Sequence, residues 1–158
     1  MRKIKISDSV TEVTHIVMPN DANPLQFLRG GRLVDWMDIA SEITAQKLTH
    51  RIGVTVSIDS MTFKKPIRIG DIVTIRAQVT RTFNTSMEIL TEVWAENLIW
   101  KNGSRVKSRS KTNEAYFTFV AVDENGKPVK IPAITPETGR EKLLYKSALQ
   151  RKNSRIPK

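Results

Sequence analysis

Residues 20–49 read NDANPLQFLRGGRLVDWMDIASEITAQKLT. The stretch starts as a loop, because Asn20, Asn23 and Pro24 are turn formers and proline disfavours helix at the residue before it. From about residue 32 to residue 49 the period is helical, and one face carries Leu33, Trp36, Met37, Ala40 and Ile43. The stretch therefore predicts one long, buried helix that is entered through a Gly-Gly pair.

After this helix the apolar residues alternate with polar ones, as in strands. The pattern recurs in four segments, at about residues 54–59, 73–80, 87–95 and 115–121. The Lys101-Asn102-Gly103 sequence is a hairpin signal, and short turns favour antiparallel neighbours. With a lead strand in residues 1–18, the pattern predicts an α+β architecture, in which one helix packs on an antiparallel sheet. We expect a single domain over residues 1–135, then a basic C-terminal helix and tail over residues 136–158.

The composition narrows the function classes. The chain has 158 residues, and its 26 Lys and Arg against 16 Asp and Glu give a net charge of +10. This balance is typical of a protein with a polyanionic partner (nucleic acid, a membrane surface or a phosphate-bearing small molecule) or of a solvated basic surface. No apolar run approaches the roughly 20 residues of a membrane span, and no secretory signal is apparent. The absence of cysteine fits a reducing, cytoplasmic location.

The sequence lacks the residues that several common kinds of catalytic or binding site require. The chain has two histidines, His15 and His50, so a Ser-His-Asp arrangement has little material. No His or Cys cluster has metal-ligand spacing, and neither common glycine-rich nucleotide loop occurs. Hydrolytic chemistry would therefore use carboxylates, amides and backbone donors, and we expect no metal and no cofactor.

Three features of the helix entry are candidates for such chemistry. Asp38 lies opposite the apolar stripe, where partial desolvation at a subunit interface would suit a general base; alternatively it belongs to a solvated acidic face with Asp35 and Glu42. Asn23 before a proline is either turn chemistry or a catalytic amide. The Gly30-Gly31 pair is either a tight entry or a source of free N–H groups for an oxyanion.

Taken together, these residues resemble the hotdog-fold acyl-CoA thioesterases, in particular the cytosolic long-chain and acetyl-CoA hydrolase branch. The resemblance covers about residues 15–135. Its motifs are Asn23-Pro24, Gly30-Gly31, Leu33, Trp36-Met37-Asp38, Val54 to Asp59, Phe63, Pro66, Gly70-Asp71, Thr80-Arg81, Phe83, Thr85 to Glu88 and Glu96-Asn97. It implies a hotdog fold, with the antiparallel sheet wrapped around one long central helix.

The resemblance also implies roles and partners. Asp38 matches the catalytic carboxylate, Asn23 the catalytic asparagine that faces it from the partner subunit, and Gly31 the N–H that polarises the thioester carbonyl. Coenzyme A would be bound by two strand segments and two C-terminal basic residues: Val56, Ser57, Ile58, Thr85, Ser86, Met87, Arg151 and Lys152. It further implies acyl-CoA as substrate in fatty acid metabolism and a homo-oligomer, either a dimer or a hexameric trimer of dimers, with no nucleic-acid or membrane partner.

Two departures keep an alternative open. Relatives often have glycine at the position of Gln26 and histidine at that of Arg29. Gln26 cannot adopt a positive φ as cheaply as glycine, so the loop path could differ. Arg29 adds a cation near the expected thioester. These changes favour the alternative of a hotdog protein that binds acyl-CoA with little or no catalysis. A nucleic-acid-binding module is a third reading, motivated by the net charge alone.

Overall fold

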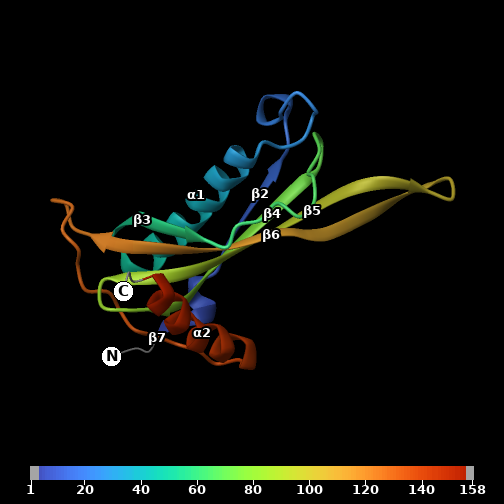
Figure 1. The fold of residues 1–158 in the computed structure, drawn as a ribbon. Coiled ribbons are helices and arrows are strands. Elements are labelled where there is room, and N and C mark those ends of the chain that lie inside the picture. Colours follow the sequence, from blue (N-terminus) through green and yellow to red (C-terminus); the bar gives the residue numbers. More distant parts are fainter. Residues whose placement is uncertain (1–3, 156–158) are drawn as a thin grey trace.

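A computed structural model describes residues 4–155 of the chain (Figure 1). Its elements, in chain order, are β1 (Ile4–Lys5), a 3₁₀ turn η1 (Ile6–Ser9), β2 (Thr11–Ile16), η2 (Pro19–Asp21), α1 (Gly30–Thr49), β3 (Ile52–Asp59), β4 (Ile72–Thr82), β5 (Ser86–Lys101), β6 (Ser104–Val122), β7 (Ile134–Thr135) and α2 (Gly139–Arg155). The predicted helix, lead strand and four later strands are all present.

Five of the strands form one antiparallel sheet in the order β2-β4-β5-β6-β3. The first and last strands of this order, β2 and β3, flank α1 in the sequence, and α1 lies along one face of the sheet (Figure 1). The short strands β1 and β7 form a separate parallel pair. The α+β prediction, with an antiparallel sheet around one long helix, is confirmed.

Helix α1 begins at Gly30, two residues before the predicted start, and ends at Thr49, followed by His50 in the left-handed conformation (φ 53°). Leu33, Trp36, Met37 and Ala40 are buried against the sheet, as predicted. Burying a side chain as large as that of Leu33 or Met37 contributes roughly 1.5–3 kcal/mol to the stability of the fold. Ile43 was expected on the same face, but it is 37% exposed. The prediction was wrong there because α1 leaves its Ile39 and Ile43 side uncovered within one chain.

The contact between α1 and the sheet is apolar but includes satisfied hydroxyl groups. Phe117 and Phe119 of β6 are fully buried and their rings pack at 6.5 Å between centroids. Ser41 of α1 and Thr91 of β5, both buried, share a hydrogen bond of 2.7 Å. Because buried polar groups are costly unless they are paired, this bond fixes how the helix sits on the sheet.

Strands β5 and β6 continue beyond the rest of the sheet as a two-stranded hairpin (Figure 1). The turn has positive φ at Asn102 (50°) and Gly103 (75°), the pattern of a type I′ turn, so the hairpin signal is confirmed. The predicted strands stop near residues 95 and 115 because the basic residues between Lys101 and Lys111 obscure the alternation. Pairing extends them to Lys101 and back from Ser104.

Helix α2 covers part of the sheet face opposite α1. The Glu88 carboxylate of β5 is fully buried there and accepts hydrogen bonds from Thr80, Arg151 and Arg155. The helix was predicted over residues 136–152 and spans Gly139–Arg155; the end of the predicted tail, residues 156–158, lies outside the described residues. No helix in residues 4–155 is long and apolar enough to cross a membrane.

Candidate active site

The loop before α1 is held by the buried carboxylate of Asp21. This group accepts hydrogen bonds from the Met18 N–H (2.9 Å) and from Nε of Arg32 (2.8 Å) in the first turn of α1. The Met18 N–H and then Arg32 lower the pKa of Asp21, against the opposing effect of burial. The loop that contains Asn23 is therefore attached to the start of the helix by an ionised carboxylate.

Asn23 organises the tip of this loop. Its side-chain oxygen accepts hydrogen bonds from the N–H groups of Leu25 (3.0 Å) and Phe27 (3.1 Å). These bonds determine which end of the amide is the oxygen, so the NH₂ group is the end left for other partners. The turn reading of Asn23 is thus correct, and it leaves two side-chain donors for a ligand or a second chain.

Gln26 and Arg29, the two residues that depart from the family pattern described above, lie in the same loop. Gln26 takes up a positive φ of 64°, so the loop adopts a left-handed turn there without a glycine. Arg29 donates from Nη2 to the carbonyl oxygen of Asn20 (3.0 Å) and from Nε to that of Asp21 (3.4 Å). Arg29 therefore braces the loop, and its charge is engaged by loop carbonyls.

Gly31 lies in the first turn of α1 with its N–H free of acceptors among residues 4–155. The first backbone hydrogen bonds of this turn are those that the Arg32 and Leu33 N–H groups donate to the Arg29 carbonyl oxygen (both 3.1 Å), and no side chain caps the helix. A Cβ at Gly31 would meet nothing within 4 Å, so the approach is open. Free N–H groups at a helix start attract a developing negative charge.

A cavity of about 420 Å³ opens beside this helix start. It is largely apolar, and the Phe63 ring packs against Gly30, 3.0 Å from where a Cβ would stand. Its apolar lining residues are Leu28, Leu33, Phe63, Pro66 and Ile67.

Asp38 lies two turns into α1 and is half-buried. Its Oδ1 accepts a hydrogen bond of 2.7 Å from the hydroxyl of Thr55 on β3, while no partner for Oδ2 is present among the described residues. The other two acids on that side of the helix are bound to neighbouring side chains of α1. Asp35 forms an ion pair with Arg32, and Glu42 accepts a hydrogen bond from the side-chain amide of Gln46. Asp38 is thus distinct from the solvated acids beside it.

Thr55 is a site residue that the sequence reasoning missed. Its alternating strand motif predicts only a strand residue there, and the family resemblance points to Val56, Ser57 and Ile58 as the ligand contacts. The position of Thr55 in the strand could have indicated this role. Thr55 is on the same strand face as Gly53, which lies against Ala45 of α1. A hydroxyl on the helix-facing side of a strand needs a polar partner, and Asp38 is that partner.

A β-bulge in β3 separates Thr55 from the predicted coenzyme A segment. The register with β6 shifts between Thr55, opposite Phe119, and Ser57, opposite Thr118. As a result Thr55 faces α1, whereas Ser57 faces α2, where Nη1 of Arg155 lies 3.4 Å from its hydroxyl. Val56 and Ile58 are exposed. Bulges next to active sites commonly redirect side chains in this way.

The second predicted segment lies on the other side of β6. Ser86 pairs with Val120, which also pairs with Val54 of β3, so the two segments are two strand spacings apart, about 10 Å. Thr85 and Ser86 are half-buried. Met87 is fully buried in the core, so its contact with coenzyme A stays a prediction.

The two predicted basic residues of α2 have different surroundings. Arg151 forms a double hydrogen bond with Glu88 (2.9 and 2.7 Å) and lies 3.8 Å above the Tyr116 ring. Burial lowers the pKa of Arg151, but Glu88 outweighs it and the pKa is raised. The Lys152 ammonium lies 3.9 Å from the Phe83 ring centroid. In this conformation the Arg151 charge is balanced, and contact of either residue with coenzyme A stays a prediction.

One chain does not bring Asn23 and Asp38 together. Asp38 is eight residues beyond Gly30, about 12 Å along the helix, and among residues 4–155 no hydrogen bond joins it to the Asn23 loop. Beside Asp38, strand β3 pairs only with β6 in the described part of the chain and leaves an open edge. That edge and α1 expose Ile39, Ile43, Ile52, Val54, Val56 and Ile58.

No group of three or more His, Cys, Asp or Glu residues in the described ranges is arranged to hold a metal ion.

The chain is similar in sequence and in structure to several known proteins. The profile of the thioesterase superfamily matches residues 25–99. The uncharacterized acyl-CoA thioester hydrolase YkhA of Bacillus subtilis is 38% identical over 90% of this chain and 79% of its own length. A crystal structure described as an apo-hexameric acyl-CoA thioesterase superposes with a TM-score of 0.89 and 37% identity, covering 98% of this chain and 96% of that one.

An acyl-CoA hydrolase from Staphylococcus aureus, solved with butyryl coenzyme A, coenzyme A and coenzyme A disulfide, has a TM-score of 0.85 and 33% identity, covering 98% of this chain and 90% of its own. Structures of its alanine variants also match; they replace an asparagine, an aspartate 15 residues later and a threonine a further 17 residues on. Asn23, Asp38 and Thr55 show the same types at the same spacing. Fold, sequence and these similarities show that the chain belongs to the thioesterase superfamily, among the hotdog-fold acyl-CoA thioester hydrolases.

Proposed function

We propose that this protein hydrolyses the thioester of acyl-CoA to a free carboxylic acid and coenzyme A, at a site shared by two copies of the chain. The observation that carries the proposal is the half-buried Asp38 carboxylate, which Thr55 holds through Oδ1 while Oδ2 has no partner in the described part of the chain. A carboxylate fixed at one oxygen and free at the other is suited to accept a proton from water.

In the proposed reaction, Oδ2 of Asp38 takes a proton from a water molecule as the water oxygen bonds to the thioester carbonyl carbon. The negative charge that develops on the carbonyl oxygen is stabilised by the Gly31 N–H and the NH₂ group of Asn23, both from the other copy. Collapse of the tetrahedral intermediate breaks the carbon–sulfur bond. The proton held by Asp38 then passes to the leaving thiolate, which restores the carboxylate.

The shared site explains why one chain keeps Asn23 and Asp38 apart. The open edge of β3 and the exposed Ile39 and Ile43 of α1 form an apolar surface directly beside Asp38. An open strand edge with apolar side chains is a pairing surface. A second copy placed there would bring its Asn23 loop towards this Asp38, so we expect a homo-oligomer.

The substrate assignment is supported by the apolar cavity of about 420 Å³ beside Gly30, which would receive the acyl chain. It is also supported by the net charge of +10, which suits the phosphates of coenzyme A. We keep Val56, Ser57, Ile58, Thr85, Ser86, Met87, Arg151 and Lys152 as the proposed coenzyme A contacts. The mechanism needs neither a metal nor a cofactor. We further propose a cytoplasmic role in fatty acid metabolism.

The test is release of free thiol from acetyl-, butyryl- and palmitoyl-CoA. Asp38→Asn should lower kcat by about 10²–10⁴-fold, the usual contribution of a general base. Asp35→Asn, a matched change one turn away on the same helix, should leave kcat unchanged because Asp35 is a solvated acid paired with Arg32. An Asp38→Asn variant with ordinary turnover would refute the assignment.

The same assay addresses the alternative of acyl-CoA binding without catalysis. Wild-type protein that binds coenzyme A tightly but releases no thiol from any of the three substrates would establish that alternative. The structure gives it little support, because Gln26 and Arg29, the two departures that suggested it, are part of an intact loop.

A further inference from the structure

The cavity of about 420 Å³ beside the start of α1 has walls of two kinds. Leu28, Leu33 and Ile67 belong to the hydrophobic core and are at most 9% exposed, so their positions are fixed by close packing. Phe63 also lines the cavity, but its side chain is 59% exposed and is not part of the core. The Phe63 ring is therefore the wall that can move without repacking the interior.

The segment that carries Phe63 is held at its two ends. At one end the buried side-chain amide of Asn113 donates a hydrogen bond to the Thr62 carbonyl oxygen. At the other end the Leu28 N–H donates a hydrogen bond of 2.7 Å to the Ile67 carbonyl oxygen. Between these two bonds, residues 63–66 take part in no hydrogen bond within the described part of the chain. The Phe63 ring is thus placed by packing alone.

The Phe63 ring lies directly on the first residue of α1. A Cβ at Gly30 would be 3.0 Å from Cζ and 3.2 Å from Cε1 of the ring, so the ring fits there because residue 30 has no side chain. The next residue is Gly31, whose N–H is proposed to bind the carbonyl oxygen, and consecutive Cα atoms are about 3.8 Å apart. The ring therefore narrows the cavity where the first carbons of an acyl chain would enter it.

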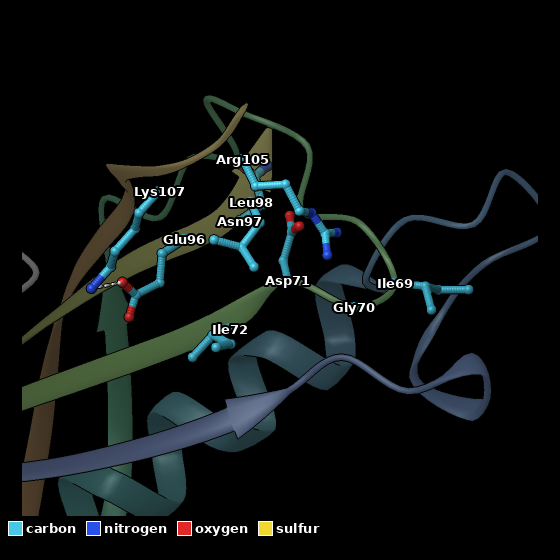
Figure 2. Close-up of a pocket in the computed structure, with 9 residues that line it drawn as sticks. All are labelled: Ile69, Gly70, Asp71, Ile72, Glu96, Asn97, Leu98, Arg105 and Lys107. Atoms are coloured by element: carbon cyan, nitrogen blue, oxygen red, sulfur yellow. Dashed lines mark ion pairs between the residues drawn. The ribbon is translucent and has the colours of Figure 1, made fainter. Parts of the chain in front are cut away.

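A second cavity, of about 500 Å³, lies at the base of the hairpin formed by β5 and β6 (Figure 2). Its charged lining residues are Asp71, Glu96, Arg105 and Lys107. Lys107 forms an ion pair of 2.6 Å with Glu96. An acyl chain placed there would remove water from these charges, which is costly, and none of the candidate catalytic residues lines this cavity. The cavity beside Gly30 is therefore the better place for the acyl chain.

We infer that Phe63 determines how well the site accepts long acyl chains relative to short ones, an inference that rests on the acyl-CoA hydrolysis proposed above. A short chain fits beside the ring while the ring lies on Gly30. A long chain extends past this point only when the ring turns outwards, towards solvent. The aliphatic parts of Lys64 and Lys65, which also line the cavity, continue the apolar path beyond the ring.

The experiment compares kcat/KM for palmitoyl-CoA with kcat/KM for butyryl-CoA in the wild type, Phe63→Ala and Phe63→Trp. Phe63→Ala should raise the palmitoyl-to-butyryl ratio about tenfold or more, because a misfit of a single methylene in an apolar pocket already changes kcat/KM about 10–200-fold. The larger ring introduced by Phe63→Trp should lower the ratio.

Leu143→Ala is the control, since Leu143 of α2 is an equally exposed apolar residue (69%) that does not line the cavity. It should leave the ratio unchanged. Circular dichroism and thermal unfolding show whether each variant is folded. A ratio that stays constant or falls in Phe63→Ala would overturn the inference, and so would an equal rise in Leu143→Ala.

A binding measurement separates this inference from the proposed function. Calorimetry gives the Kd of butyryl-CoA and of palmitoyl-CoA, below the concentration at which palmitoyl-CoA forms micelles, for Asp38→Asn with and without Phe63→Ala. Removal of the ring should strengthen palmitoyl-CoA binding relative to butyryl-CoA binding. If this shift occurs although the wild type releases no thiol from either substrate, the role of Phe63 is established and the proposed hydrolysis alone is refuted. If neither acyl-CoA binds or is hydrolysed, both are refuted.

Discussion

Thr55 of β3 donates a hydrogen bond of 2.7 Å to Asp38 of α1, joining the strand at the edge of the sheet to the central helix. The bond directs one carboxylate oxygen towards the protein and leaves the other free. Thr55 acts through Asp38 and is a positioning residue in the proposed reaction.

The first prediction concerns this bond. Thr55→Val should lower kcat about 10–100-fold with little change in KM, because a hydrogen bond to a charged group contributes about 1.5–3 kcal/mol. Thr55→Ser, which keeps the hydroxyl, should restore most of the rate. The measurement is thiol release as a function of pH. A Thr55→Val variant with unchanged kcat and pH profile would show that the bond is only structural.

The second prediction tests the shared site by mixing subunits. Asn23→Ala and Asp38→Asn proteins should each be nearly inactive. When they are co-expressed with different tags, random pairing should restore about a quarter of wild-type activity, since half the dimers are mixed and one of their two sites is intact. A site contained in one chain would give no recovery.

The third prediction concerns Gln26, which has a φ of 64°. A left-handed conformation costs a residue with a Cβ about 1–2 kcal/mol, partly offset in glycine by the greater entropy of its unfolded state. Gln26→Gly should therefore raise the free energy of unfolding by up to about 1 kcal/mol, and Gln26→Val should lower it. Urea denaturation measures both. A less stable glycine variant would mean that the Gln26 side chain supplies an interaction of its own.

The fourth prediction concerns the buried Glu88 carboxylate. Arg151→Met should lower the free energy of unfolding by about 2–3 kcal/mol, less than for a fully buried pair, because Arg155 and Thr80 still bind Glu88. Lys152→Met is the control, since its ammonium contacts the Phe83 ring and should matter little. Equal effects of the two substitutions in urea denaturation would contradict the role given to Glu88.

The fifth prediction concerns pH. Burial and the charge of Arg32 lower the pKa of His15, outweighing the opposite effect of Asp21. As pH falls below about 6.5, the unfolded chain therefore takes up a proton before the folded one does. The free energy of unfolding should therefore decrease as pH falls below about 6.5, and should keep its full value above that pH. His15→Phe, which preserves the stacking on Trp36, should flatten the dependence of Tm on pH between about 7.5 and 5. The same slope in His15→Phe, or a flattened one in the control His50→Gln, would contradict the assignment.

Local pattern was sufficient to predict most of the fold. The helical period from residue 32 to residue 49 predicted α1, and the alternation after Gly53 predicted the strands, because each pattern reflects which side chains must leave water. The Asn102-Gly103 turn required positive φ at both residues, which is why the hairpin could be recognised. Expectations were less accurate where charge hid the pattern, as in the outer parts of β5 and β6.

What the sequence by itself determined was the two helices, the strands of the main sheet and, through ordered motifs, the family with its candidate residues Asn23, Gly31 and Asp38. Only the tertiary structure showed that Thr55 holds Asp38, that Glu88 neutralises Arg151, and that Asn23 and Asp38 of one chain remain apart. The physical reason is the separation in sequence between the residues that interact. Helix and strand periods depend on neighbours a few residues away, whereas these contacts join residues 17 and 63 positions apart and depend on how the bulge in β3 and the packing of α2 direct side chains across the sheet.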